Sequence, residues 1–132
     1  MIDAQPMSTP PLTVLVIEDD RLVRSLAQRM LEHFGYQVVC TGSGESGIEV
    51  VHRESDRLAA VLLDLTLPNM SGMQVLEGIR SADPDLPVVL TSGHLESEVH
   101  GLEDSSCAFF LQKPFLPRDL AACLERVRRI PT

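Results

Sequence analysis

The most informative run in this sequence is Ala59-Ala60-Val61-Leu62-Leu63-Asp64, which is followed directly by Leu65-Thr66-Leu67-Pro68. An apolar run without polar alternation predicts a strand that is covered on both faces. Such strands are typical of parallel sheets with helices on each side. The carboxylate of Asp64 comes where this strand ends, and the carboxyl edge of an open parallel sheet is where ligands bind. The run therefore predicts both the class of fold and the place of its site.

A second apolar run, residues 12–17, also ends in acidic residues: Glu18, Asp19 and Asp20. If the two strands are neighbours, three or four carboxylates converge on one crevice. Two unit charges about 4 Å apart repel by roughly 4 kcal/mol at an effective dielectric of about 20. The cluster therefore needs a cation or a proton to offset its charge. Oxygen ligands alone favour a hard divalent ion, Mg²⁺ first.

Short apolar runs alternate with helical patterns along the rest of the chain. Helix signals include Asp20 as an N-cap, Gly35 as a C-terminal stop and Pro117 in a first turn. This alternation predicts an α/β fold, a five-stranded parallel sheet with helices on both faces. We expect strands at 12–17, 36–40, 59–64, 87–91 and 108–111, and helices at 21–34, 73–82, 95–103 (weak) and 117–130. After a turn at 41–44, we also expect a short helix that carries Ile48 and Val51 and continues to about Glu54.

Composition and charge narrow the class of protein. The chain has 132 residues, 44% hydrophobic and 23% charged, which suits one ordinary domain. Its formal net charge of −8 disfavours nonspecific binding to nucleic acid. Neither a membrane span nor a secretory signal is present. We expect a cytoplasmic protein with no nucleic-acid and no membrane partner, with residues 1–11 as a flexible leader before a domain at 12–130.

Cysteines and arginines carry no chemistry in this interpretation. Three widely spaced cysteines are expected to be small buried hydrophobes in a reducing compartment: Cys40, Cys107 and Cys123. Four arginines near the C-terminus are interpreted as partners of the last helix dipole, rather than as a nucleic-acid patch. They are Arg118, Arg126, Arg128 and Arg129.

The other predicted strand ends also carry polar side chains. Thr91-Ser92 follows the fourth strand, and Lys113-Pro114 follows the fifth. Carboxylates can hold a metal or act as a nucleophile, while a hydroxyl and an ammonium can bind phosphoryl oxygens. Together these groups are what phosphoryl transfer requires.

The chain closely resembles the receiver domain of two-component response regulators, over roughly residues 12–130. Four motifs match in order and spacing: Val16-Ile17-Glu18-Asp19-Asp20, Leu63-Asp64 with the following segment to Gly72, Thr91-Ser92-Gly93 and Lys113-Pro114-Phe115. The resemblance implies the flavodoxin-like, doubly wound sheet order 2-1-3-4-5.

The resemblance also implies a mechanism. Asp64 would accept a phosphoryl group from a phosphohistidine on a sensor histidine kinase or a histidine phosphotransfer protein. Mg²⁺ would be held by Asp19, Asp64 and the backbone carbonyl of Thr66, with Glu18 acting mainly through metal-bound water. Such a chain is a signalling phosphoacceptor that promotes its own phosphoryl transfer and loss, not an enzyme with a separate substrate.

Further roles follow from the same resemblance. Lys113 and the Thr91 hydroxyl would bind phosphoryl oxygens, Phe110 would be the switch aromatic, and the bond before Pro114 would be cis. The surface of the fourth helix, fifth strand and fifth helix would then contact a downstream protein. We expect no output segment after Ile130, in which case the chain would be either a stand-alone regulator or the receiver of a hybrid histidine kinase.

Three alternatives compete with this interpretation. A haloacid-dehalogenase-like phosphatase needs a second Asp two residues after the nucleophile, where this chain has Thr66. A flavodoxin-like cofactor binder needs a phosphate-cradling loop where this chain has acids. A degenerate receiver that acts as a phosphate-independent interaction module stays open as the alternative, although Asp19, Asp64, Thr91 and Lys113 are all present.

Overall fold

The computed structural model describes residues 11–93 and 107–130. Its elements run in the order β1 Thr13–Ile17, α1 Arg21–His33, β2 Gln37–Thr41, α2 Gly44–Glu54, a 3-10 turn Ser55–Arg57, β3 Leu58–Asp64, α3 Gly72–Ala82, β4 Val88–Ser92, β5 Ala108–Gln112 and α5 Pro117–Val127. The weak helix expected at 95–103 and nearly all of the leader at 1–11 lie outside the described residues.

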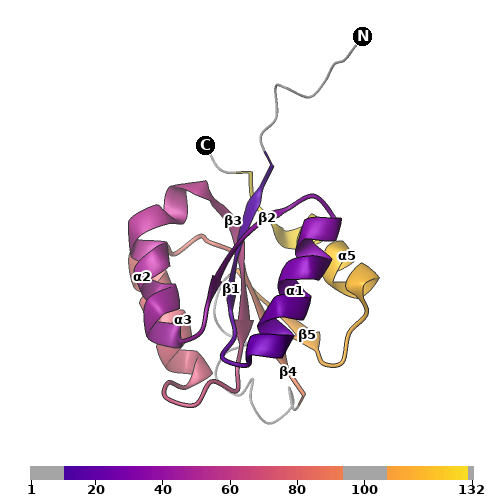
Figure 1. Ribbon diagram of the computed structural model, residues 1–132. Coiled ribbons are helices and arrows are strands. Elements are labelled where there is room, and N and C mark those ends of the chain that lie inside the picture. Colours follow the sequence, from indigo (N-terminus) through magenta and orange to yellow (C-terminus); the bar gives the residue numbers. More distant parts are fainter. Residues whose placement is uncertain (1–10, 94–106, 131–132) are drawn as a thin grey trace.

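The five strands form one parallel sheet in the order β2-β1-β3-β4-β5. Helices α2 and α3 lie on one side of it and α1 and α5 on the other (Figure 1). Every residue of β1, β3 and β4 is buried, whereas the edge strands β2 and β5 are partly exposed. The predicted α/β class and the sheet order 2-1-3-4-5 are confirmed.

Alternate residues of the central strands feed two separate hydrophobic cores. Leu15 and Leu63 point to the side of α2 and α3, where they pack with Leu76 and Ile79. Val16 and Leu62 point to the other side, where α1 and α5 supply a smaller set. This period of two is the geometry of a strand that is buried on both faces.

Helix α1 begins and ends as the sequence predicts. The Asp20 carboxylate accepts a hydrogen bond from the Val23 backbone N–H at 3.0 Å, which caps the first turn. Gly35 follows the helix with φ of +92°, the left-handed conformation that glycine adopts without steric cost.

The apolar stripe of α1 is wider than the core beneath it. At helical spacing the sequence predicts one apolar stripe, which consists of Leu22, Val23, Leu26, Ala27, Met30, Leu31 and Phe34. Of these residues, only Ala27 and Leu31 are buried. Leu22, Leu26 and Phe34 are 69%, 46% and 43% exposed. The helix therefore has a buried apolar face and, beside it, an exposed one.

Helix α5 ends earlier than predicted. It stops at Val127, and Ile130, expected on its last turn, is 70% exposed. The backbone turns extended at Arg128, and the Arg129 N–H then donates to the Ala59 carbonyl at 3.1 Å. Hydrogen bonding to the start of β3 replaces the next helical turn.

The arginines after α5 are anchors, so their assignment to the helix dipole is wrong. The Arg129 guanidinium contacts both carboxylate oxygens of Asp83, at 2.6 and 3.3 Å, and donates to the Leu58 and Ser55 carbonyls. Arg128 donates to the Tyr36 hydroxyl at 2.7 Å and lies over its ring. These contacts join the end of the described chain to the amino edge of the sheet.

Two further expectations concern the burial of the cysteines and the absence of a membrane span. Cys123 is buried as predicted, but Cys40 and Cys107 are only partly buried. In the portion of the chain that the structure describes, no helix is long and apolar enough to cross a membrane.

Candidate functional site

The carboxyl edge of the sheet brings the predicted site residues together. Asp64 is the last residue of β3 and pairs in register with Thr91 on β4. Glu18 follows β1, which is the other neighbour of β3. Lys113 follows β5, and its backbone N–H donates to the Ser92 carbonyl at 2.9 Å. Three loops distant in sequence thus converge at the point where the strand order reverses.

Asp64 is 4% exposed, and its Oδ1 atom is held by several donors. The backbone N–H of Thr66 donates to it at 3.0 Å and the Thr66 hydroxyl at 2.8 Å. The ammonium of Lys113 lies 3.7 Å from the same oxygen. These donors supply hydrogen bonds to a carboxylate oxygen that is buried away from water.

The Thr66 hydroxyl is a contact that sequence reasoning missed. That reasoning assigned only the backbone carbonyl of Thr66 a role. The sequence does carry a signal for this contact, because a hydroxyl two residues after an aspartate can donate a hydrogen bond back to the aspartate carboxylate in a turn.

Glu18 lies next to Asp64 and is also buried, at 6% exposure. Burial, with smaller contributions from a hydrogen bond to Asp64 and from that residue's charge, raises the pKa of Glu18 to about 7. The N–H of Asp20, which donates to Glu18 at 3.2 Å, and the charge of Lys113 act in the opposite direction. Glu18 therefore holds a proton readily near neutral pH when no cation is bound.

Lys113 joins the two buried carboxylates. Its Nζ lies 3.3 Å from Glu18 Oε1, besides the contact with Asp64. The peptide bond between Lys113 and Pro114 is cis. One ammonium facing two carboxylates leaves the crevice short of positive charge, so a cation would be favoured there.

The donor set fits Mg²⁺. Glu18, Asp19 and Asp64 each offer a carboxylate oxygen, and these atoms lie within 4.8 Å of one another. Opposite ligands of Mg²⁺ are about 4.2 Å apart, because each Mg–O distance is about 2.1 Å. Asp19 is exposed, which leaves one side of the cluster open to the waters that Mg²⁺ keeps.

Thr91 and Phe110 lie on the neighbouring strands. Thr91 is buried, and its hydroxyl donates to the Leu63 carbonyl at 3.4 Å, a long hydrogen bond. One cavity is lined by Glu18, Asp64, Thr91 and Lys113 together. Phe110 is partly buried and packs against the core on the α2–α3 side.

A family model for the response regulator receiver domain matches residues 14–125, most of the chain. The protein belongs to this family. Phosphorylation and Mg²⁺ binding in an acidic pocket are general properties of receiver domains, and the acidic cluster above is where this receiver has such a pocket.

Relatives agree with this assignment. The receiver is 37% identical over 124 residues to response regulator MprA of Mycolicibacterium vanbaalenii, covering 92% of this chain and 52% of MprA. The chain thus spans about half the length of the curated relatives that it matches.

Solved structures show the same fold. A sensor protein from Polaromonas sp. JS666 matches with a TM-score of 0.81 and 26% identity, covering 89% of this chain and 96% of that one. The receiver domain of the Pseudomonas aeruginosa sensor histidine kinase PA1611, solved with magnesium coordinated in its active site cleft, has a TM-score of 0.80 at 22% identity. It covers 89% of this chain and 97% of that one.

Proposed function

We propose that this receiver, residues 12–130, accepts a phosphoryl group on Asp64 from a phosphohistidine of a sensor histidine kinase or a histidine phosphotransfer protein. The observation that carries the proposal is the position of the Asp64 carboxylate, at the carboxyl end of β3, between an acidic cluster and the Lys113 ammonium. A nucleophile, a cation site and a fixed positive charge thus lie within contact of one another.

The transfer forms one bond and breaks another. A carboxylate oxygen of Asp64 bonds to phosphorus while the bond from phosphorus to the imidazole nitrogen breaks, and the imidazole leaves with the electron pair. Asp19, Asp64 and the Thr66 backbone carbonyl would hold Mg²⁺, with Glu18 acting through metal-bound water, and the bound ion would supply charge stabilisation for the phosphoryl oxygens. Lys113 would bind one of those oxygens, a role that its Nζ, 3.7 Å from Asp64 Oδ1, supports.

The same proposal includes a response to the phosphoryl group. The Thr91 hydroxyl, now in a long hydrogen bond to the Leu63 carbonyl, would exchange that acceptor for a phosphoryl oxygen. Phe110, on the neighbouring strand β5 opposite Leu90, is partly buried and would move inward. The changed surface, of the fourth helix with β5 and α5, would contact a downstream protein in the cytoplasm. The fourth helix falls outside the described residues.

Intact mass spectrometry tests the acceptor role. The protein is incubated with Mg²⁺ and acetyl phosphate and measured promptly, because acyl phosphates hydrolyse. We expect a gain of one phosphoryl group that is absent from Asp64→Ala and absent when EDTA removes the metal. Glu49→Gln, an exposed change on α2, serves as the matched control and should gain the group normally.

Beryllofluoride binding, followed by amide chemical shifts, separates the two candidate functions. A response at Thr91 and Lys113 supports the phosphoacceptor. Neither a mass gain nor a beryllofluoride response would contradict it and favour the phosphate-independent interaction module.

A further inference from the structure

Arg24, in the first turn of α1, directs its side chain back to the acidic loop, residues 18–20, that joins β1 to α1. Its Nη1 atom donates to the Glu18 carbonyl at 2.8 Å and to the Asp19 carbonyl at 3.3 Å. These two residues supply two of the three carboxylates in the acidic cluster. Arg24 does not line the cavity at Asp64. It therefore contacts the acidic loop from outside the site, through the backbone.

The two carbonyls that Arg24 binds lie on either side of the Asp19 Cα atom. Because each peptide unit is planar, the orientations of these two units set the φ and ψ angles of Asp19. Those angles in turn set the direction of the bond from Cα to Cβ, and so the direction in which the carboxylate leaves the backbone. A single guanidinium nitrogen thus holds both peptide units that orient the Asp19 side chain.

Asp19 depends on its backbone for this orientation more than the other two carboxylates do. The carboxylates of Asp64 and Glu18 accept hydrogen bonds from other side chains, from Thr66 and from Lys113 respectively. In the parts of the chain that the structure describes, no hydrogen bond reaches the exposed carboxylate of Asp19. Its direction therefore rests on the backbone of the acidic loop.

The guanidinium of Arg24 occupies space that Gly42 leaves free. A Cβ atom at position 42 would lie 3.2 Å from Arg24 Nη1 and 3.9 Å from its Cζ, so the guanidinium would have to shift by a few tenths of an ångström. Gly42 directly follows Thr41, whose carbonyl accepts a hydrogen bond from the Glu18 N–H at 3.1 Å. The chain after β2 therefore contacts the acidic loop both directly and through Arg24.

The charge of Arg24 by itself works against a bound cation. Like charges repel, so a guanidinium near a Mg²⁺ site weakens binding unless it also acts in another way. Among residues 11–93 and 107–130, Arg24 forms no ion pair with a carboxylate that would offset this repulsion. Its hydrogen bonds to the two carbonyls are charge-assisted and directional. A gain in Mg²⁺ affinity from Arg24 must therefore come from geometry.

We propose that Arg24 is a positioning residue of the cation site, which raises the affinity for Mg²⁺ by holding the backbone on both sides of Asp19. This role rests on the proposed function, because it concerns the same Mg²⁺ site. Groups that orient metal ligands without touching the metal typically contribute about 10–100-fold to affinity. Mg²⁺ demands a nearly ideal octahedron, whereas Ca²⁺ accepts irregular sets of oxygen ligands. Loss of the orientation should therefore weaken Mg²⁺ binding more than Ca²⁺ binding.

Amide chemical shifts during titration with Mg²⁺ and with Ca²⁺ test this role in Arg24→Met. Methionine is also a good helix former, but it has neither the charge nor the donors of arginine. We expect Mg²⁺ affinity to fall at least about tenfold, whereas the loss of repulsion alone would raise it. Ca²⁺ affinity should fall by a smaller factor. Arg24→Lys, which keeps a charge and donors, should recover part of the Mg²⁺ affinity.

Gly42→Ala disturbs the same contact from the other loop. The new methyl group displaces the guanidinium, so Mg²⁺ affinity should fall, by less than in Arg24→Met. In the Arg24→Met background the same change should have little further effect, because the contact is already lost. Equal losses in both backgrounds would contradict a shared contact.

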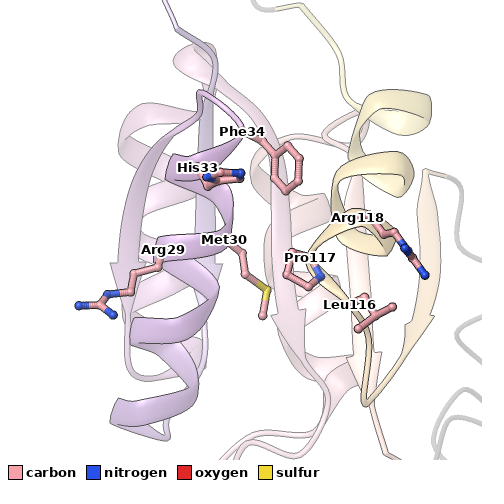
Figure 2. Close-up of a pocket in the computed structure, with 7 residues that line it drawn as sticks. All are labelled: Arg29, Met30, His33, Phe34, Leu116, Pro117 and Arg118. Atoms are coloured by element: carbon pink, nitrogen blue, oxygen red, sulfur yellow. The ribbon is translucent and has the colours of Figure 1, made fainter.

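Arg29→Met is the matched control, because it removes one positive charge from the same helix. Arg29 lies at the edge of a cavity between α1 and α5, and Figure 2 shows its side chain pointing outward, away from the other labelled residues. Mg²⁺ affinity should be unchanged in this variant. Circular dichroism of each variant in EDTA checks that it is folded. If Arg24→Met does not fold, Arg24→Lys and Gly42→Ala carry the test, and both should bind Mg²⁺ more weakly than the parent.

The outcomes separate this role from the proposed function. Mg²⁺ affinity in Arg24→Met equal to or above that of the parent would overturn the positioning role, and so would equal fold losses for Mg²⁺ and Ca²⁺. A parent that binds no Mg²⁺ would overturn the metal site itself and this role with it. A parent that binds Mg²⁺ but gains no phosphoryl group, while Arg24→Met binds Mg²⁺ more weakly, would support this role and contradict only the phosphoacceptor.

Discussion

The carboxylate of Glu18 lies next to Asp64 and contacts Lys113, and its protonation decides how much charge the crevice holds. Its pKa of about 7 in the folded protein exceeds the ordinary 4.5, so the folded state binds more protons between these values. The stability from this proton is present below pH 4.5 and is lost as pH rises through 7. Without metal, the folded protein should therefore weaken toward alkaline pH.

Glu18→Gln removes the cost of burying a charged Glu18 carboxylate beside Asp64. In EDTA at pH 8 we expect the variant to be more stable than the parent by up to about 3 kcal/mol, because no charge is buried against Asp64. The advantage should shrink toward pH 5, and Mg²⁺ should stabilise the parent more than the variant. Urea denaturation at both pH values measures this, with Glu49→Gln as the control. An advantage that does not change with pH would contradict the assigned pKa.

At the residue scale, chain order was enough to predict which residues meet at the site. Apolar runs that end in Glu18, Asp64, Thr91 and Lys113 must deliver these side chains to one edge of a parallel sheet. Their burial and protonation were not predictable, since both depend on side chains from other loops. The contact of Lys113 with Glu18, 95 residues away, is such a case.

Helices α2 and α3 pack closely because Gly78 has no side chain. A Cβ atom there would lie 2.5 Å from Ile48 Cδ1 and 2.9 Å from Cγ1. Alanine in a helix normally stabilises by about 1 kcal/mol relative to glycine. Here overpacking outweighs that gain, since it typically costs 1–3 kcal/mol.

Gly78→Ala should therefore lower the free energy of unfolding by about 1–2 kcal/mol. Combining it with Ile48→Val should cost less than the sum of the two single changes, because the shorter side chain relieves the clash. Thermal or urea unfolding of the parent, the two single variants and the double variant gives the double-mutant cycle that measures this. Ser81→Ala, exposed on the same helix, should not destabilise. Additive costs would show that Ile48 is not the obstacle.

For single helices and strands, the type of element was more predictable from the sequence than its length or its buried face. Periodicity placed α1, but it could not say that its stripe would be half exposed, because the core beneath it receives only part of that face. Periodicity also extended the predicted last helix to Ile130. That error arose because hydrogen bonds from Arg129 to β3 are non-local and leave no local signal.

Across the whole molecule, Arg129 joins the end of α5 to β3 and to the loop before β4 through Asp83. Hydrogen bonds from Arg129, with burial opposing them, hold the pKa of Asp83 below its ordinary value. The stability from this pair is therefore present above pH 3.8 and is lost as pH falls through the lowered pKa.

Arg129→Ala should cost about 1–3 kcal/mol of stability at pH 7, because it removes charge-assisted hydrogen bonds and leaves Asp83 without its partner. The cost should decline as unfolding is measured at progressively lower pH, because Asp83 gains a proton as pH falls through its lowered pKa. Arg126→Ala, exposed on α5, is the control and should be nearly neutral. A cost that persists unchanged in acid would point to the backbone carbonyl contacts instead of the ion pair.

The arrangement of strands and helices in the whole molecule was more predictable from the sequence than the details of single residues or elements. Alternating strands and helices require right-handed crossovers in a parallel sheet, which leaves few possible topologies. The order 2-1-3-4-5 came from the family resemblance, and the structure confirms it.

The anchor at Arg129 has a practical consequence. It holds Ile130 at the edge of the sheet where β1 also begins, so both ends of the described chain from 11 to 130 emerge on the side opposite Asp64 (Figure 1). A tether to a sensor surface, or a fused fluorescent protein, attached at either end would leave the acidic rim facing solution. Such a molecule could be loaded with phosphodonor, rinsed and reloaded while it remains attached.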